Sequence, residues 1–211
     1  MSIGKERKSK ILIFDFDGTI VDSKQVYYHA MNKHLEDYGF TRKEIDKAID
    51  VGLSVAETLK KLKLGKIFSW FLKRRIMKDV LINASKIKKC KDVDSIKNIK
   101  NRKILISNSL QEFVFPIIKH LKLKEEFDEI YTAENFDDKT KFIKNYVKRR
   151  KINKKNCYYI GDRATDAKLA GKVGIKSIIV VGKCAWDSRA EILNSKPDFV
   201  ISDIREIRKL I

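Results

Sequence analysis

The chain has 211 residues, of which 43% are hydrophobic and 36% are charged, a composition typical of a globular protein with one large domain, or with a core domain and a smaller one. No apolar run approaches the roughly 20 residues that span a bilayer, and the polar, basic start of the chain does not resemble a signal peptide. We therefore expect a cytoplasmic protein with no membrane partner. Three widely spaced cysteines argue against a disulfide scaffold and against a zinc cluster.

The formal net charge of +19 predicts attraction to polyanions and to phosphorylated ligands. Lysines occur in nearly every expected helix rather than in one cluster, so a general compositional bias explains the charge better than a nucleic-acid site does. Nucleic acid stays open as a partner but is not favoured. The sequence gives no indication of the oligomeric state.

The first expected element is a strand at residues 10–16, because its apolar run is continuous, as in strands buried on both faces. Two carboxylates, Asp15 and Asp17, stand at its end, followed by Gly18 and Thr19. Carboxylates without a partner are costly at the edge of a core, and ligands of parallel α/β sheets gather past the carboxyl ends of strands. This stretch therefore predicts a metal-assisted site.

The next block, residues 24–89, has helical patterns and no evident strand. Helices are expected at 25–38 and 66–88, and capping-box patterns predict helix starts at Thr41 and Ser54. The block is interpreted as a small all-helical domain, residues 24–92, inserted after the first strand.

Within the long helix of this block, Trp70 and Phe71 precede three basic residues. They could form an aromatic, basic surface for nucleic acid or membrane. Packing of both rings inside the helical bundle is the interpretation we favour.

From residue 93 onward, expected strands and helices alternate. Strands are expected at 103–106, 130–133, 157–160, 177–181 and 199–201, and helices at 93–99, 110–121, 139–151, 165–173, 188–194 and 204–210. This alternation is the pattern of βαβ units with a parallel sheet and right-handed crossovers. The sequence thus predicts an α/β core domain made of residues 1–23 and 93–211.

Polar residues follow several of these strands. Beside Asp15 and Asp17, they are Ser107 and Asn108, Lys139 at the start of a helix, and Gly161-Asp162 with Asp166. Carboxylates are hard oxygen ligands that hold Mg²⁺, a hydroxyl and an amine can hold phosphate oxygens, and an aimed carboxylate is a competent nucleophile. The set suits phosphoryl transfer.

These residues resemble the haloacid dehalogenase-like (HAD) hydrolases over the whole chain, most weakly in the helical insert. The matches to the four motifs of that family, in their usual order, are Asp15–Thr19 for DxDGT, Ser107 for the strand-end hydroxyl, Lys139 for the lysine, and Gly161, Asp162 and Asp166 for GDxxxD. The resemblance implies a Rossmann-like three-layer core with a parallel sheet, plus a helical cap domain.

The resemblance also implies roles. Asp15 would be the nucleophile that forms an aspartyl-phosphate, and Asp17 would be the general acid and base. Ser107 would hold the transferring phosphoryl group and Lys139 would neutralise its charge. The other implied phosphate contacts are Asn108, Gly18 and Thr19. The implied Mg²⁺ ligands are Asp15, the backbone carbonyl of Asp17, Asp162 and Asp166, the last directly or by supporting the others.

Two positions depart from the family pattern. Lys139 is not followed by the proline common in relatives, so Lys141 is a rival candidate; the spacing to Gly161 favours Lys139. Arg163 stands where a small polar residue is common, and either a substrate contact or a surface role would explain it.

The resemblance narrows the type of member. Asp17 argues against dehalogenases and phosphonate-cleaving relatives, and the helical insert has the size of the cap found in the phosphoglycolate phosphatase and β-phosphoglucomutase branch. The expected function is a Mg²⁺-dependent phosphatase for a small phosphorylated metabolite, such as phosphoglycolate or a sugar or nucleotide monophosphate. The alternatives are a phosphomutase of the β-phosphoglucomutase type and, less favoured, a nucleic-acid-directed protein on the same scaffold.

Overall fold

The structure is a computed structural model that describes residues 10–51 and 55–211. The chain divides into two compact units: one runs to Val21 and resumes at Lys89, and the other is Asp22–Lys88. The assignment of a catalytic core and a cap domain stays a prediction. The expected capping box at Ser54 begins outside the described residues.

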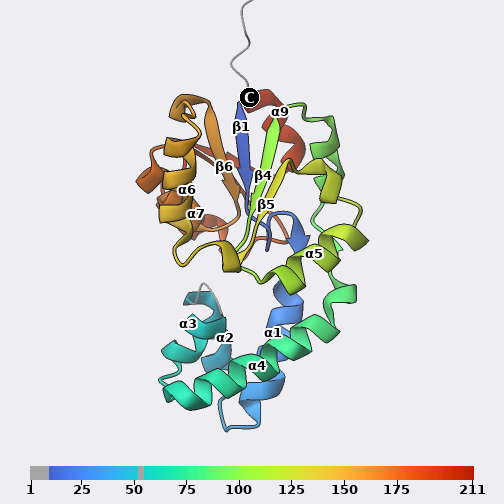
Figure 1. The fold of residues 1–211 in the computed structure, drawn as a ribbon. Coiled ribbons are helices and arrows are strands. Elements are labelled where there is room, and N and C mark those ends of the chain that lie inside the picture. Colours follow the sequence, from blue (N-terminus) through green and yellow to red (C-terminus); the bar gives the residue numbers. More distant parts are fainter. Residues whose placement is uncertain (1–9, 52–54) are drawn as a thin grey trace, which may run out of the picture. The chain divides into compact units, whose positions relative to one another are not determined.

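The first unit is built on a parallel sheet of six strands in the order β5-β4-β1-β6-β7-β8 (Figure 1). Its strands are β1 (Ile11–Phe14), β4 (Arg102–Ile106), β5 (Glu129–Tyr131), β6 (Cys157–Gly161), β7 (Lys176–Val180) and β8 (Phe199–Ile201). The predicted α/β class is confirmed, and each expected strand of this unit is present with its ends shifted by two residues at most.

Helices lie on both sides of this sheet. They are α5 (Gln111–His120), α6 (Lys139–Arg149), α7 (Ala164–Val173), α8 (Arg189–Asn194) and α9 (Ile207–Leu210), with short 3₁₀ turns η2 (Val93–Asn98), η3 (Lys124–Glu126), η4 (Ala133–Asn135), η5 (Lys154–Asn156) and η6 (Ile204–Glu206). Helices α6 and α7 lie on one side of the sheet, and α5 and α9 on the other (Figure 1). The helix expected at 93–99 is a 3₁₀ turn, and the closing helix begins as one.

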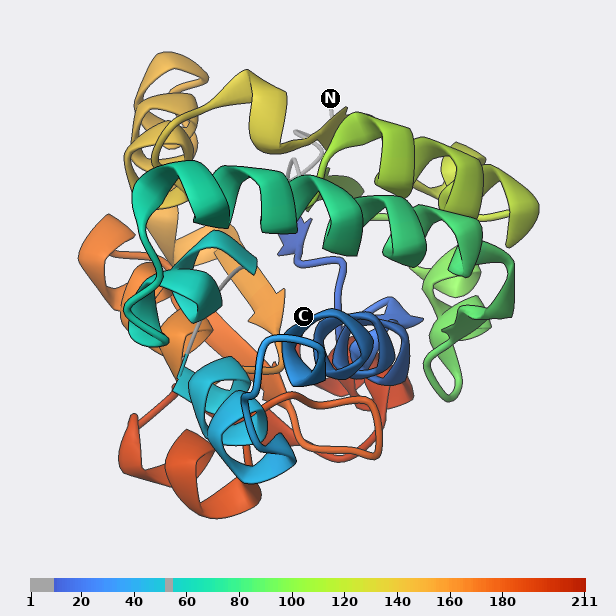
Figure 2. The ribbon, with the colours of Figure 1, turned by 90° about the horizontal axis from the view of Figure 1, so that it is seen from below.

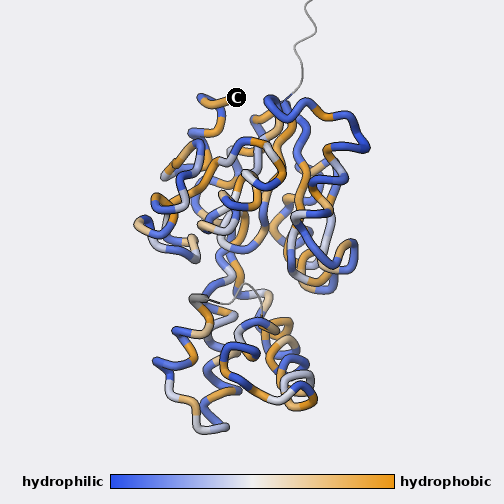
Figure 3. Tube along the Cα trace, turned by 90° about the vertical axis from the view of Figure 1, so that its left-hand side faces the viewer, coloured by the Kyte–Doolittle hydropathy of each residue, from blue (hydrophilic) through white to orange (hydrophobic). Residues whose placement is uncertain are grey.

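The core of this unit has two layers because side chains alternate across each strand. On one face of the sheet, Ile13 and Tyr159 are fully buried against Ile143 of α6 and Ala170 of α7. On the other, the ring of Phe14 meets that of Phe127 edge to face, with centroids 5.8 Å apart. Figure 3 shows the resulting alternation of hydrophobic and hydrophilic stretches along the chain.

The second unit is helical. Its helices are α1 (Lys24–Glu36), α2 (Arg42–Val51), α3 (Val55–Lys61) and α4 (Lys66–Ile82), followed by the 3₁₀ turn η1 (Ala84–Lys86). The predicted capping box at Thr41 is confirmed: its N–H donates to Glu44 Oε2 at 2.9 Å, and the Glu44 N–H donates to Thr41 Oγ1 at 3.4 Å. Helix α4 packs against α1 (Figure 2).

The buried face of α4 differs from the one expected. Leu72, Ile76 and Val80 are buried, whereas Trp70 is 52% and Phe71 57% exposed. The prediction that both rings pack inside the bundle is therefore wrong. Apolar residues occur all around this helix, so two different stripes have helical spacing, and the spacing alone did not distinguish them.

The end of this block also differs. The helix expected to reach residue 88 ends at Ile82, where the Asn83 side chain donates to the Asp79 carbonyl at 2.8 Å. Residues Lys88–Lys89 then form β3, which pairs with β2 (Val21–Asp22) in a sheet of two strands. A strand of two residues is too short to show a period, so the expectation of no strand in this block was wrong.

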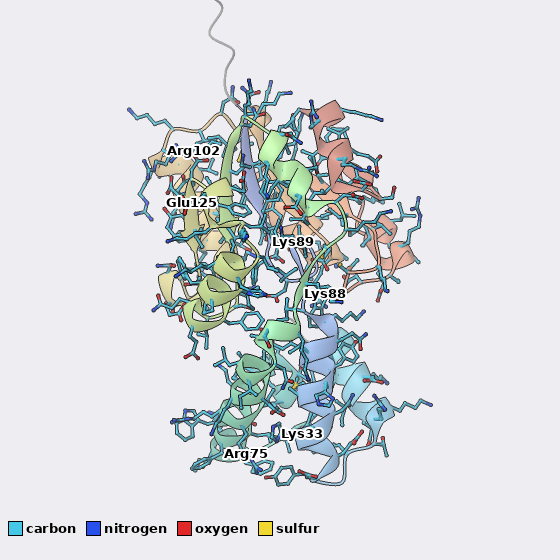
Figure 4. All side chains as sticks on the ribbon, turned by 90° about the vertical axis from the view of Figure 1, so that its right-hand side faces the viewer. Lys33, Arg75, Lys88, Lys89, Arg102 and Glu125 are labelled. Carbon is cyan, nitrogen blue, oxygen red and sulfur yellow. The ribbon has the colours of Figure 1, made fainter. Side chains whose placement is uncertain are left out.

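Basic side chains project from the helices of both units (Figure 4), and the labelled Lys33 and Arg75 come from α1 and α4. Within the helical unit they have partners: Lys33 Nζ lies 2.9 Å from Asp79 Oδ2, and Arg75 donates to the Tyr38 hydroxyl at 3.2 Å. Among the described residues, no helix has the length and apolar character needed to cross a bilayer.

The corrected face of α4 leads to a matched test. Leu72→Ala removes a fully buried side chain and is expected to lower the free energy of unfolding by about 2–5 kcal/mol. Phe71→Ala, one residue away, removes a larger but exposed side chain and is expected to cost less than about 1 kcal/mol. Urea denaturation followed by circular dichroism measures both. Equal losses would contradict the face assigned here.

Candidate active site

The candidate site lies at the carboxyl edge of the sheet, where three adjacent strands end. Ser107 follows β4, Asp15 follows β1 and Asp162 follows β6. Sheet pairing continues through Asp15, whose N–H donates to the Ile160 carbonyl at 2.8 Å. The strand order runs outward from β1 in both directions, so the site lies at the kind of switch point where α/β sheets bind ligands.

Asp15 has a close cationic partner. Its Oδ1 lies 2.6 Å from Lys139 Nζ, and both side chains are largely buried. Lys139 is the first residue of α6, whose start is fixed by Asp138 accepting the Lys141 N–H at 2.9 Å. The side chain of the rival Lys141 is exposed. The structure thus brings Lys139, rather than Lys141, to the expected nucleophile.

The turn after β1 carries the second carboxylate. Asp17 Oδ2 accepts a hydrogen bond from the Ser109 hydroxyl at 2.6 Å. Gly18 has a φ of +78°, and a Cβ there would collide with the carboxylate of Asp162 and the ring of Trp186. Glycine is required here both for the backbone conformation and for the close approach of Asp162.

Asp162 is fully buried and each of its oxygens has a donor. Oδ1 accepts from the Thr19 hydroxyl at 3.0 Å, and Oδ2 accepts from the backbone N–H of Trp186 at 2.7 Å. Asp166 secures the same turn, because its Oδ2 accepts the N–H groups of Asp162 and Arg163 at 3.1 and 3.0 Å. These bonds fix the orientation of both carboxylates.

A metal fits this set of residues. Asp15, Asp162 and Asp166 each offer a carboxylate oxygen, and the three oxygens lie within 4.8 Å of one another. Burial and the neighbouring acids raise the pKa of Asp162 well above its ordinary value, and burial together with Asp15 raises the pKa of Asp166 to about 7. A divalent cation would relieve this repulsion, and oxygen-only ligands suit a hard cation.

The strand-end hydroxyl is also in place. Ser107 is fully buried, and its Oγ accepts the Ser109 N–H at 2.9 Å. Its neighbour Asn108 is exposed. The phosphate-binding roles expected for Ser107, Asn108, Gly18 and Thr19 stay predictions.

Sequence reasoning missed three contacts of this site. Ser109 bonds to Asp17, the Trp186 amide bonds to Asp162, and Asp187 pairs with Arg163. Ser109 directly follows the predicted Ser107 and Asn108, so its polar side chain was a usable signal. A backbone amide from the loop after β7 has no signature in residue type. Arg163, expected at the surface or on the substrate, is largely buried in its ion pair.

The fold and site define a class: a parallel α/β protein with a polar, metal-competent site at its central strand ends. The chain belongs to the haloacid dehalogenase-like hydrolase family, whose model matches residues 12–180. The resemblance inferred from the four motifs is confirmed.

Proteins similar to this chain in sequence or in fold include phosphatases and other hydrolases of this family. The chain is 26% identical to a phosphoserine phosphatase of Methanocaldococcus jannaschii, over 98% of this chain and 99% of the relative. It is 21% identical to a phosphoglycolate phosphatase of Aquifex aeolicus, over 96% of each. Its fold is similar to a haloacid dehalogenase-like hydrolase from Streptococcus pneumoniae, with a TM-score of 0.81, 17% identity and coverage of 96% and 98%.

The raised carboxyl pKa values predict a pH-dependent stability. An acid with a higher pKa in the folded state holds its proton more tightly there, so the metal-free fold loses stability as pH rises from about 4 to about 7. Asp166→Asn removes one such group. We therefore expect the melting temperature of the metal-free variant, minus that of the metal-free wild type, to become larger as pH rises from about 5 to about 8.

Mg²⁺ is expected to raise the melting temperature of the wild type more at about pH 8 than at about pH 5, because it binds the ionised carboxylates. Thermal scans with Mg²⁺ and with chelator measure both effects. A pH-independent difference between variant and wild type would contradict the shifted pKa of Asp166.

Proposed function

We propose that this protein is a Mg²⁺-dependent phosphatase that hydrolyses a small phosphorylated metabolite through an aspartyl-phosphate on Asp15. The observation that carries the proposal is the placement of Asp15, 2.6 Å from Lys139 Nζ and within one cluster with Asp162 and Asp166. Family membership agrees with a hydrolase. The two curated relatives are named for phosphoserine and phosphoglycolate, so small phosphorylated acids are the first substrates to test, followed by sugar and nucleotide monophosphates.

In the first step, a carboxylate oxygen of Asp15 attacks phosphorus while the bond from phosphorus to the leaving oxygen breaks. Lys139 holds the carboxylate in place and offsets negative charge that spreads over the phosphoryl oxygens. Ser107, at the end of the adjacent strand, donates its hydroxyl to the same group. Positioning of this kind lowers the barrier without further covalent chemistry.

Asp17 moves the protons. Its protonated carboxyl gives the leaving oxygen a proton in the first step, and its carboxylate then takes a proton from the water that attacks the aspartyl-phosphate. Release of inorganic phosphate restores the Asp15 carboxylate. The Ser109 hydroxyl, 2.6 Å from Asp17 Oδ2, orients this carboxyl group for both transfers.

Asp15, Asp162 and Asp166 would hold the cation, together with the Asp17 backbone carbonyl implied by the family pattern. When bound, Mg²⁺ supplies positive charge that lets the acids stay ionised next to an anionic substrate. The high net positive charge of the chain favours the approach of such a substrate.

The nucleophile and the acid/base residue are expected to fail in different ways. Asp15→Asn should reduce phosphate release from a panel of phosphomonoesters to the background without enzyme. Asp17→Asn should slow turnover by about 10²–10⁴-fold, but still release a burst of p-nitrophenol from p-nitrophenyl phosphate, because that leaving group needs little protonation. Undiminished phosphate release by Asp15→Asn would overturn the proposal.

The two candidate lysines provide a matched pair. Lys139→Met removes the amine 2.6 Å from Asp15 and is expected to lower kcat by about 10²–10³-fold. Lys141→Met removes an exposed amine two residues along the same helix and should leave kcat within about twofold. Steady-state kinetics at saturating Mg²⁺ measures both variants. Similar losses in the two would show that net charge, rather than the Asp15 contact, matters.

A further inference from the structure

The loop after β7, residues 181–188, is attached to the metal-competent turn by an ion pair that the proposed chemistry does not use. We propose that Asp187 is a positioning residue, which together with Arg163 holds this loop against the turn carrying Asp162 and Asp166, and so sets the affinity of the site for its cation. This inference rests on the proposed function.

Asp187 uses both carboxylate oxygens on that turn. Oδ1 accepts from Arg163 Nε at 3.0 Å, and Oδ2 accepts from the Ala164 N–H at 2.8 Å. The side chains of Arg163 and Asp187 are only 13% and 12% exposed, so solvent competes weakly with these bonds. Ala164 is the first residue of α7, and a carboxylate there satisfies a free amide and favours the helix dipole.

The attachment reaches the cation ligand through the neighbouring residue. The backbone N–H of Trp186 donates to Asp162 Oδ2 at 2.7 Å, while the Thr19 hydroxyl donates to Oδ1 at 3.0 Å. The Arg163 guanidinium also lies over the Trp186 ring, 5.6 Å from its centroid. One donor on each oxygen fixes the plane of the Asp162 carboxylate. If the loop were released from Arg163, the hydrogen bond from Trp186 would be lost and only the bond from Thr19 would orient this carboxylate.

The same contacts explain an arginine beside the metal-site aspartate. Its Nε bonds to Asp187, so the residue acts as a link between two loops rather than as an exposed charge. Groups that orient metal ligands through hydrogen bonds commonly contribute tenfold to hundredfold to metal affinity. Asp187 and Arg163 are expected to contribute in this range.

The test is titration calorimetry of Mg²⁺ into the whole protein, together with steady-state kinetics. Asp187→Asn keeps the size of the side chain but places its NH₂ group against one of the two donors, Arg163 Nε or the Ala164 N–H, so that hydrogen bond is lost. This variant is expected to weaken Mg²⁺ binding by about 10–100-fold. Its kcat should recover at saturating Mg²⁺. Asp187→Glu, which keeps both acceptors, should restore part of the affinity. Arg163→Met should weaken binding less, because the Ala164 bond remains.

A second capping aspartate of the same unit serves as the matched control. Asp203 accepts the Arg205 N–H and Nε, both at 2.8 Å, and starts the short turn η6. Asp203→Asn removes the same kind of cap and pair away from the turn of Asp162, and should leave Mg²⁺ affinity unchanged.

The outcomes separate this inference from the proposed function. Wild-type Mg²⁺ affinity in a folded Asp187→Asn protein, or equal weakening in Asp203→Asn, overturns the positioning role while phosphatase activity can stand. Weakened Mg²⁺ binding by Asp187→Asn supports it even if no phosphomonoester in the panel is hydrolysed, a result that would sink only the proposed function. A wild-type protein that binds no Mg²⁺ overturns this inference as well.

Discussion

Repulsion among three closely spaced carboxylates, two of them buried, is the constraint on which the arrangement of this site depends. Asp15, Asp162 and Asp166 offer oxygens within 4.8 Å of one another, and the cost of ionising them together appears in the raised pKa values of the latter two. Such a cluster persists only if donors surround it. Lys139 and the Thr19 hydroxyl supply two of these donors, and backbone amides supply the others. A divalent cation would complete the balance, and without one the cluster is expected to destabilise the fold as pH rises.

The donors come from separate parts of the first unit. The lysine begins α6, and the threonine belongs to the turn after β1. The amides come from the turn between β6 and α7 and from the loop after β7. The parallel sheet brings these segments together because its strands all end at one edge. Loops that hold none of the predicted site residues, such as residues 181–188, thereby contact the candidate metal ligands. The Arg163–Asp187 pair is the clearest example of this dependence.

Sequence reasoning succeeded for residues next to predicted strands and failed for contacts that depend on loops or on the packing of a helix. Residues directly after strands, such as Asp15 and Asp162, were predicted together because parallel strand ends must meet at one edge. Ser109 was missed because it lies three residues beyond the end of β4, and Trp186 was missed because it acts through its backbone amide. The prediction of the buried face of α4 was wrong for a different reason. Apolar residues occur all around that helix, so its spacing alone did not show whether Phe71 or its neighbour Leu72 is buried.

Taken alone, the sequence determined the α/β class, the order of the strands along the chain and the residue types available for chemistry, since periodicity and strand-end residues are local properties. It also determined the family, through motifs that each occupy a few adjacent positions. Only the tertiary structure decided which lysine meets Asp15, which side of α4 is buried, and which loop orients Asp162. These contacts join residues far apart in the chain, and they depend on distance, burial and hydrogen-bond direction, which no local pattern encodes.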